Sequence, residues 1–119
     1  MKIKLRGEMF PALKNGTKTR TSRFGKRDIN VGDKAVFVMT ENEKVKFPVV
    51  ITGVSYCKFF ELTQEEAIKE GYSSLEELKS ALIKIYNPFD DDVFTIIEFK
   101  PIGWNKKKVV WLCKILLRY

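Results

Sequence analysis

The most informative absence in this chain of 119 residues is histidine, of which it has none. Histidine is the commonest transition-metal ligand in proteins and the side chain that most readily acts as a base near neutral pH. Its absence removes the usual metal ligand and the usual general base. Any catalysis by this chain must therefore use Lys, Glu, Asp, Thr, Ser, Tyr or Cys.

Cysteines and long apolar runs are also scarce. Cys57 and Cys113 are far apart and form no CxxC pair, so we expect two small buried side chains and not a disulfide framework. The longest apolar run, 109–117, contains Lys114 and is far shorter than the ~20 residues of a membrane-spanning helix. The first ten residues alternate charged and apolar side chains, which argues against a signal peptide. We therefore expect a cytoplasmic protein without a membrane segment.

What the chain does contain is enough apolar material for one core, together with an excess of positive charge. Hydrophobic residues make up 45% of the sequence and aromatic residues 13%, and no repeat or linker divides it. We therefore predict a single domain over residues 1–119. The net charge of +7 favours an anionic partner, of which nucleic acid or a nucleotide is the commonest kind.

The local patterns predict strands, then two helices, then strands. In the first half we expect strands over 2–5, 18–23, 35–38 and 46–60, a short helix over 7–16, and a bulge at Gly53. In the centre, a capping box of Thr63 and Glu66 and a stop at Gly71 predict a helix over 64–70. Apolar residues at helical spacing predict another over 74–86, and strands over 92–102 and 107–119 follow. This order predicts an α+β domain, built as a small mixed or closed barrel.

The stretch Asn15–Arg27 concentrates positive charge and hydroxyl groups after a turn-forming Asn-Gly. Five of its thirteen residues are cationic, and four carry a Thr or Ser hydroxyl. Three interpretations are open: a solvated basic loop, a phosphate clamp, or a place where a lysine and a threonine act together. The last requires a lysine with a lowered pKa, which nearby like charge and partial burial would provide.

Two segments of the chain resemble one known family. The motif GxKxxTxR at 16–23, followed by VGD at 31–33, resembles the signature of ASCH domains, a branch of the PUA-like superfamily of β-barrels. The segment 61–86 and the strand "FTIIEFKPI" after it resemble the two-helix insert and the next strand of the same family. The likeness covers most of residues 8–102. It implies a PUA-like mixed β-barrel with two helices inserted between strands.

Within this family the chain resembles the small bacterial N(4)-acetylcytidine amidohydrolases. The resemblance implies a catalytic set of Lys18, Thr21 and Glu70. It also implies that this set acts without a metal or a cofactor. In that set the lysine takes the threonine proton, the threonine oxygen attacks the acetyl carbonyl, and the glutamate handles protons or orients the base. Residues three apart on a straight strand point to opposite faces, so Lys18 must lie in the loop after Gly16 or the strand must bulge.

The remaining candidates are residues that would hold a substrate or RNA. Cations near the motif suit a phosphate or a polarised carbonyl oxygen, and an aromatic ring at the helix junction suits a stacked base. The candidate residues for binding a substrate or RNA are Arg20, Arg23, Lys26, Arg27 and Tyr72. The alternative function is an RNA-binding module, with ribonuclease activity in some relatives, that uses the same basic cleft. The partner is thus RNA or a modified nucleoside, and the oligomeric state and the role of residues 103–119 stay open.

Overall fold

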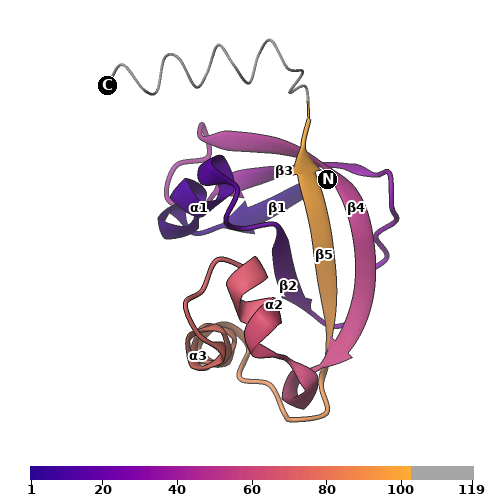
Figure 1. Ribbon diagram of the computed structural model, residues 1–119. Helices are drawn as coiled ribbons and strands as arrows, with labels where there is room; N and C mark the ends of the chain where they lie inside the picture. The colour runs from indigo at the N-terminus through magenta and orange to yellow at the C-terminus, as the bar shows by residue number, and fades with distance from the viewer. Residues whose placement is uncertain (103–119) are drawn as a thin grey trace.

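The computed structural model describes residues 1–102 of the chain. Its elements, drawn in Figure 1, are β1 (Lys2–Leu5), η1 (Gly7–Met9), α1 (Phe10–Asn15), β2 (Arg20–Phe24), β3 (Lys34–Met39), β4 (Lys46–Lys58), η2 (Phe59–Glu61), α2 (Gln64–Lys69), α3 (Leu75–Tyr86) and β5 (Val93–Pro101). The elements expected from the sequence over residues 1–102 are all present. The strand predicted over 107–119 lies outside the described residues.

The five strands form one sheet in the order β1-β3-β4-β5-β2. β1 runs parallel to β3, and every other neighbouring pair is antiparallel. The long strand β4 joins the two halves of the sheet, because its first part pairs with β3 and its later part pairs with β5. The register of β4 against β5 shifts between Ile51 and Gly53, which confirms the predicted bulge.

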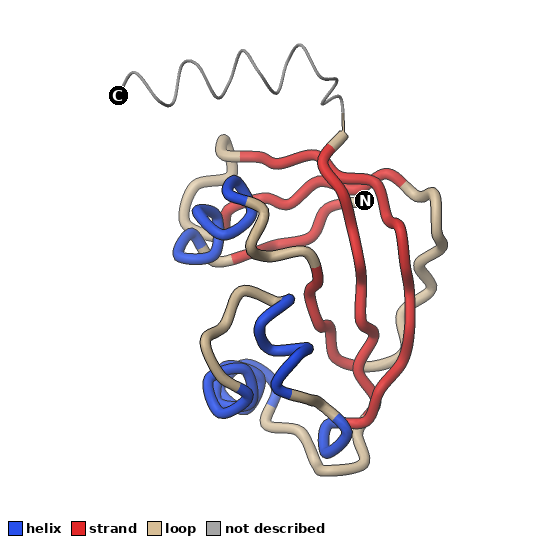
Figure 2. The backbone as a smooth tube through the Cα atoms, viewed as in Figure 1, coloured by secondary structure: helices blue, strands red, loops and turns tan. Residues whose placement is uncertain are grey.

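The sheet is open, since its edge strands β1 and β2 do not pair with each other. One side chain links the two edges: Arg23 of β2 donates from Nη2 to the carbonyl oxygen of Lys4 in β1, at 2.9 Å. The α+β class is therefore confirmed, whereas residues 1–102 do not show the closure of a barrel. Figure 2 places α1 near one end of the long strands and α2 and α3 near the other.

The helices begin and end where the sequence signals predict. The Thr63 hydroxyl accepts a hydrogen bond from the backbone N–H of Glu66, and Ser74 caps α3 in the same way. Gly71 follows α2 with a φ of 93°, a left-handed conformation that glycine adopts without strain. Only half of the expected capping box is present, because the Glu66 side chain turns away from the helix start toward Arg20.

Two hydrophobic clusters lie on opposite faces of β5. Ile97 belongs to the cluster around β1, β3 and α1, whereas Ile96 belongs to the cluster beneath α2 and α3. Tyr72, in the turn after α2, packs against both clusters. This turn therefore lies where the two halves of the domain meet, close to the predicted site residue Glu70.

Candidate functional site

A cavity of about 590 Å³ is lined by β1, β2, the turn after α2, and α3. This volume lies within the range of small-molecule sites. The three predicted catalytic residues, Lys18, Thr21 and Glu70, all contribute to its lining. The fold therefore brings a glutamate from the end of α2 to the same hollow as the basic stretch.

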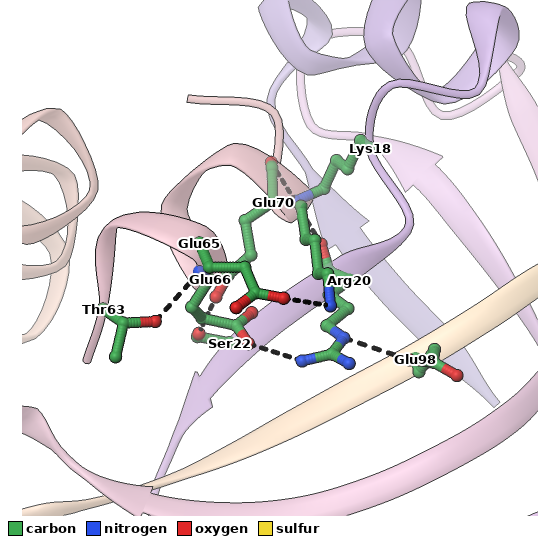
Figure 3. Close-up of polar contacts among 9 residues, drawn as sticks. Lys18, Arg20, Ser22, Thr63, Glu65, Glu66, Glu70 and Glu98 are labelled. Atoms are coloured by element: carbon green, nitrogen blue, oxygen red, sulfur yellow. Dashed lines mark hydrogen bonds and ion pairs between the residues drawn. The ribbon is translucent and has the colours of Figure 1, made fainter. Parts of the chain in front are cut away.

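Lys18 is a buried lysine in the loop before β2, with 3% of its surface exposed. Its Nζ donates to the backbone carbonyl oxygens of Arg20 and Glu70, at 2.9 Å each (Figure 3). Burial lowers the pKa of Lys18 to about 8, with Arg23 adding to the effect and the charge of Glu70 opposing it. The spacing of Lys18 and Thr21 allowed two arrangements, a lysine in the loop after Gly16 or a bulged strand. Lys18 lies in the loop, so no bulge in β2 is required.

The two carbonyl acceptors suit Lys18 as a neutral amine. An ammonium has three N–H donors, whereas a neutral amine has two and carries a lone pair. Lys18 has two acceptors among residues 1–102, which satisfies both N–H groups of the amine and leaves its lone pair free. A lysine with this environment is able to accept a proton near neutral pH.

Glu70 caps the C-terminal end of α2 and is 2% exposed. Its Oε2 accepts a hydrogen bond of 2.5 Å from the hydroxyl of Ser22. Burial raises the pKa of Glu70 to about 8, and a hydrogen bond with the side chain of Glu66 raises it further, while Lys18 and Ser22 lower it. The direction of this shift favours the protonated form of Glu70, although it lies near a lysine.

The turn at Gly71, which has a φ of 93°, brings Glu70 close to Lys18. A Cβ atom at position 71 would lie 3.4 Å from the Cβ of Lys18 and 3.0 Å from the Cε of Met9. The turn then brings the Glu70 carbonyl within hydrogen-bonding distance of the lysine Nζ. A side chain at position 71 would strain the turn that presents this carbonyl to Lys18.

Thr21 lies in β2 with 2% of its surface exposed. Its Oγ1 accepts a hydrogen bond from Arg23 Nη1 at 2.9 Å. Its hydroxyl hydrogen has no acceptor within residues 1–102, and neither Lys18 nor Glu70 is hydrogen-bonded to it. The three predicted catalytic side chains therefore share the cavity without direct bonds between Thr21 and the other two.

The predicted binding residues divide between the cavity and the surface. Arg23, Arg27 and Tyr72 line the cavity, and the Arg23 guanidinium is held by Thr21 and by backbone carbonyls of β1 and β2. Arg20 is not part of this lining and forms ion pairs with Glu66 and Glu98, at 2.9 and 3.0 Å. Lys26 lies outside the cavity, over the ring of Tyr56.

Two residues of this network were not predicted as part of the site from the sequence. Ser22 lies next to the predicted nucleophile, and the sequence pattern predicts Glu66 only as a capping residue. Glu66 and Glu70 are four residues apart on a helix, which places both carboxyls on one face. That spacing was the signal available in the sequence.

Within residues 1–102, no cluster of three or more His, Cys, Asp or Glu side chains is arranged to hold a metal ion. The helices of the same part of the chain are all too short or too polar to cross a membrane. The polar groups that line the cavity are hydroxyls, three lysines, three arginines and the carboxyls of Asp28 and Glu70.

Comparison with known proteins identifies one family and its fold. The family model described as "ASCH domain" matches residues 3–102. An ASCH domain from Lactobacillus crispatus JV V101 superposes with a TM-score of 0.67 at 18% identity, over 76% of this chain and 68% of that one. The hypothetical protein PH0355 gives 0.66 at 24% identity, over 85% and 97%, and ASCH from Zymomonas mobilis gives 0.65 at 14% identity, over 84% and 68%.

The identities of these solved structures are all below 25%, so they establish a shared fold and no more. No curated protein matches the chain. The chemistry at the cavity has to be inferred from the side chains themselves.

Proposed function

The chain belongs to the ASCH domain family, and from its buried Lys18 and Glu70 we propose that it is a metal-independent amidohydrolase that removes the acetyl group of N(4)-acetylcytidine. The observation that carries the proposal is a pair of buried groups at one small-molecule-sized cavity, both with a pKa of about 8. A lysine whose pKa is lowered and a carboxyl whose pKa is raised are able to act as base and acid near neutral pH.

The proposed reaction has two stages: the acetyl group is first transferred from the cytosine nitrogen to Thr21, and water then hydrolyses the acetyl ester. The Thr21 hydroxyl proton moves to the Lys18 amine as Oγ1 bonds to that carbon, the bond to the cytosine nitrogen breaks, and the leaving amine takes a proton from Glu70. Water then attacks the acetyl ester and gives a proton to the Glu70 carboxylate. Acetic acid leaves as the Thr21 oxygen regains a proton from the Lys18 ammonium.

Arg23 supports Thr21 as the nucleophile. Its guanidinium donates to Oγ1, so the hydroxyl hydrogen of Thr21 is left pointing elsewhere for transfer to a base. During attack, negative charge develops on the acetyl carbonyl oxygen, and a guanidinium beside Oγ1 is a candidate donor to it. Tyr72 lines the cavity between the two hydrophobic clusters and offers a ring face to the cytosine base.

The direct test is incubation of the purified chain with N(4)-acetylcytidine, followed by chromatography for cytidine and acetate. We expect both products in equal amounts, without added metal and in the presence of a chelator. Because Lys18 must be neutral and Glu70 protonated, kcat/KM is expected to peak near pH 8 and to fall on both sides. Absence of cytidine release across this pH range contradicts the proposal.

RNA binding is the second candidate, because cations surround the cavity. Its lining includes Lys2, Lys4, Arg6, Arg23 and Arg27. With the net charge of +7, these side chains suit the phosphates of a single strand whose target base enters the cavity. We expect binding to a short single-stranded RNA to weaken with salt, with a log–log slope of about −0.7 per phosphate contacted.

Substitution separates specific binding at the cavity from general attraction. Arg27→Gln is expected to reduce the salt slope by roughly one phosphate contact. Lys26→Gln removes a neighbouring cation outside the cavity and serves as the matched control. Equal effects of the two substitutions would contradict binding at this cavity.

A further inference from the structure

Two buried carboxyl groups project from the same face of α2. Glu66 is 9% exposed and Glu70 is 2% exposed, and they are separated by one helical turn. In Figure 3 both side chains extend from the helix toward β2. Two carboxylates side by side in a buried site repel each other, so one of them is favoured to keep its proton.

The partners of the two carboxyls differ. Oε1 of Glu66 accepts from Arg20 Nη1 at 2.9 Å, so Glu66 has a positive partner as a carboxylate. Oε2 of Glu70 accepts from the neutral hydroxyl of Ser22. Lys18 gives its hydrogen bonds to backbone carbonyls and forms no ion pair with either carboxylate within residues 1–102.

One oxygen of this network lacks a donor. Oε2 of Glu66 is buried and accepts no hydrogen bond from an N–H or hydroxyl group among the described residues. A buried acceptor left without a donor is unfavourable. A proton on Glu70 would supply that donor, because the two carboxyls lie on the same face of α2, one helical turn apart.

Some groups around Glu70 raise its pKa and others lower it. Burial is the main reason for its raised pKa, the hydrogen bond with Glu66 is the next, and Lys18 opposes both. For Lys18 the order differs: burial lowers its pKa most, and the charge of Glu66, which raises it, is the weakest of four causes. Glu98 and Arg20 complete the network on the β2 and β5 side, and Arg23 faces Lys18 from β2.

We propose that Glu66 is a positioning residue that accepts a hydrogen bond from protonated Glu70 and thereby keeps the acid of the site in its neutral form. Glu66 is not part of the cavity lining, so it acts through Glu70 and not on the substrate. Arg20 takes part by donating to Oε1 of Glu66 and holding that side chain in place. The role of Glu70 as the catalytic acid rests on the proposed function. The hydrogen bond from protonated Glu70 to Glu66 does not depend on that function.

The test is a site-resolved titration of the full chain without substrate. With glutamate labelled with carbon-13 at the side-chain carboxyl, nuclear magnetic resonance follows each carboxyl from about pH 4 to about pH 10. We expect Glu70 to lose its proton near pH 8 and the Glu66 carbon to respond at the same midpoint. A wild-type Glu70 that titrates near its ordinary value of 4.5, or a Glu66 carbon that does not respond, overturns the proposal.

Two amide substitutions then identify the cause. Glu66→Gln keeps the shape of the side chain and removes its charge, so the Glu70 midpoint is expected to fall by about one pH unit or more while burial keeps it above 4.5. Glu98→Gln removes the other carboxylate that pairs with Arg20 and is expected to leave the midpoint unchanged. Equal midpoints in Glu66→Gln and the wild type contradict the assignment. If Glu66→Gln does not fold, the wild-type titration still decides.

The same variants separate this proposal from the proposed function. If the chain hydrolyses N(4)-acetylcytidine, Glu66→Gln lowers the pH above which kcat/KM declines, and Glu98→Gln does not. If the chain does not hydrolyse N(4)-acetylcytidine, the titration of Glu66 and Glu70 still tests the hydrogen bond between them. In that case only the proposed amidohydrolase activity is rejected. Unchanged pH profiles together with an unchanged Glu70 midpoint reject the role of Glu66 alone.

Discussion

The basic stretch has two parts that look alike in sequence and differ in the folded chain. The first part, 18–23, packs against the end of α2, where Lys18 is buried and Arg20 is ion-paired. The second part holds Lys26 and Arg27, which are exposed. Both parts contain cations within a few residues of each other, so composition does not distinguish them. Contact with α2 buries Lys18, and this burial lowers the pKa of its amine.

The largest effect expected from this difference is the loss of the nucleophile. Thr21→Ala removes the oxygen that forms the ester, so release of cytidine should fall to the rate without enzyme. Thr17→Ala removes an exposed hydroxyl of the same stretch outside the cavity lining and should retain full activity. Chromatography of both reactions, with circular dichroism to verify folding, checks the pair. Activity retained by Thr21→Ala would show that another group attacks the substrate.

Lys18→Arg should reduce kcat/KM by about 10²–10⁴-fold, the usual contribution of a general base. Arginine keeps the positive charge but stays protonated at all relevant pH values, so it offers no lone pair. Lys26→Arg makes the same change in the exposed part and should alter kcat/KM by less than about twofold. Comparable losses in the two variants would mean that only charge matters at this stretch, as expected of a phosphate clamp.

Burial of Lys18 and Glu70 also predicts how stability depends on pH. Glu70 binds its proton more tightly in the folded chain, so stability falls as pH rises from about 4.5 to about 8. Lys18 binds its proton less tightly when folded, so its unfavourable contribution is relieved between about 8 and about 10.5. Together the two groups favour a minimum in the free energy of unfolding near pH 8.

Urea unfolding of Glu70→Gln and the wild type across this range isolates the glutamate. The variant should lack the decline between about pH 4.5 and about pH 8, whose slope for one proton is at most about 1.4 kcal/mol per pH unit. Glu65→Gln changes an exposed carboxylate of the same helix and should follow the wild type. A decline that persists in Glu70→Gln would place its origin in another group.

Much of the fold follows from local signals in the sequence. Thr63 and Ser74 begin the two central helices, Gly71 ends the first, and Gly53 marks the bulge, all by local rules that tertiary contacts do not override here. The open edge between β1 and β2 was not predicted. Whether distant strands pair depends on the path of the whole chain and not on the pattern within either strand.

The resemblance predicted which three residues meet at the cavity, but not how they are connected. The resemblance named Lys18, Thr21 and Glu70, and the cavity brings them together. It gave no indication that Arg20 would pair with Glu66, because ion pairs between distant segments are set by tertiary packing. For the same reason, the two carbonyl acceptors of Lys18 could not be predicted from spacing, whereas the four-residue spacing of Glu66 and Glu70 did signal the carboxyl pair on α2.

The most direct test of the account is the titration of Lys18 itself. Nitrogen-15 labelling of lysine side chains, with the Nζ resonance of Lys18 assigned by its absence in Lys18→Arg, follows the proton without any substrate. The buried position predicts a midpoint near pH 8 in the folded chain, rising to the ordinary lysine value when urea unfolds it. A folded-state midpoint at about 10.5 would contradict the account, because Lys18 would then be a permanent cation like its exposed neighbours and could not act as the base.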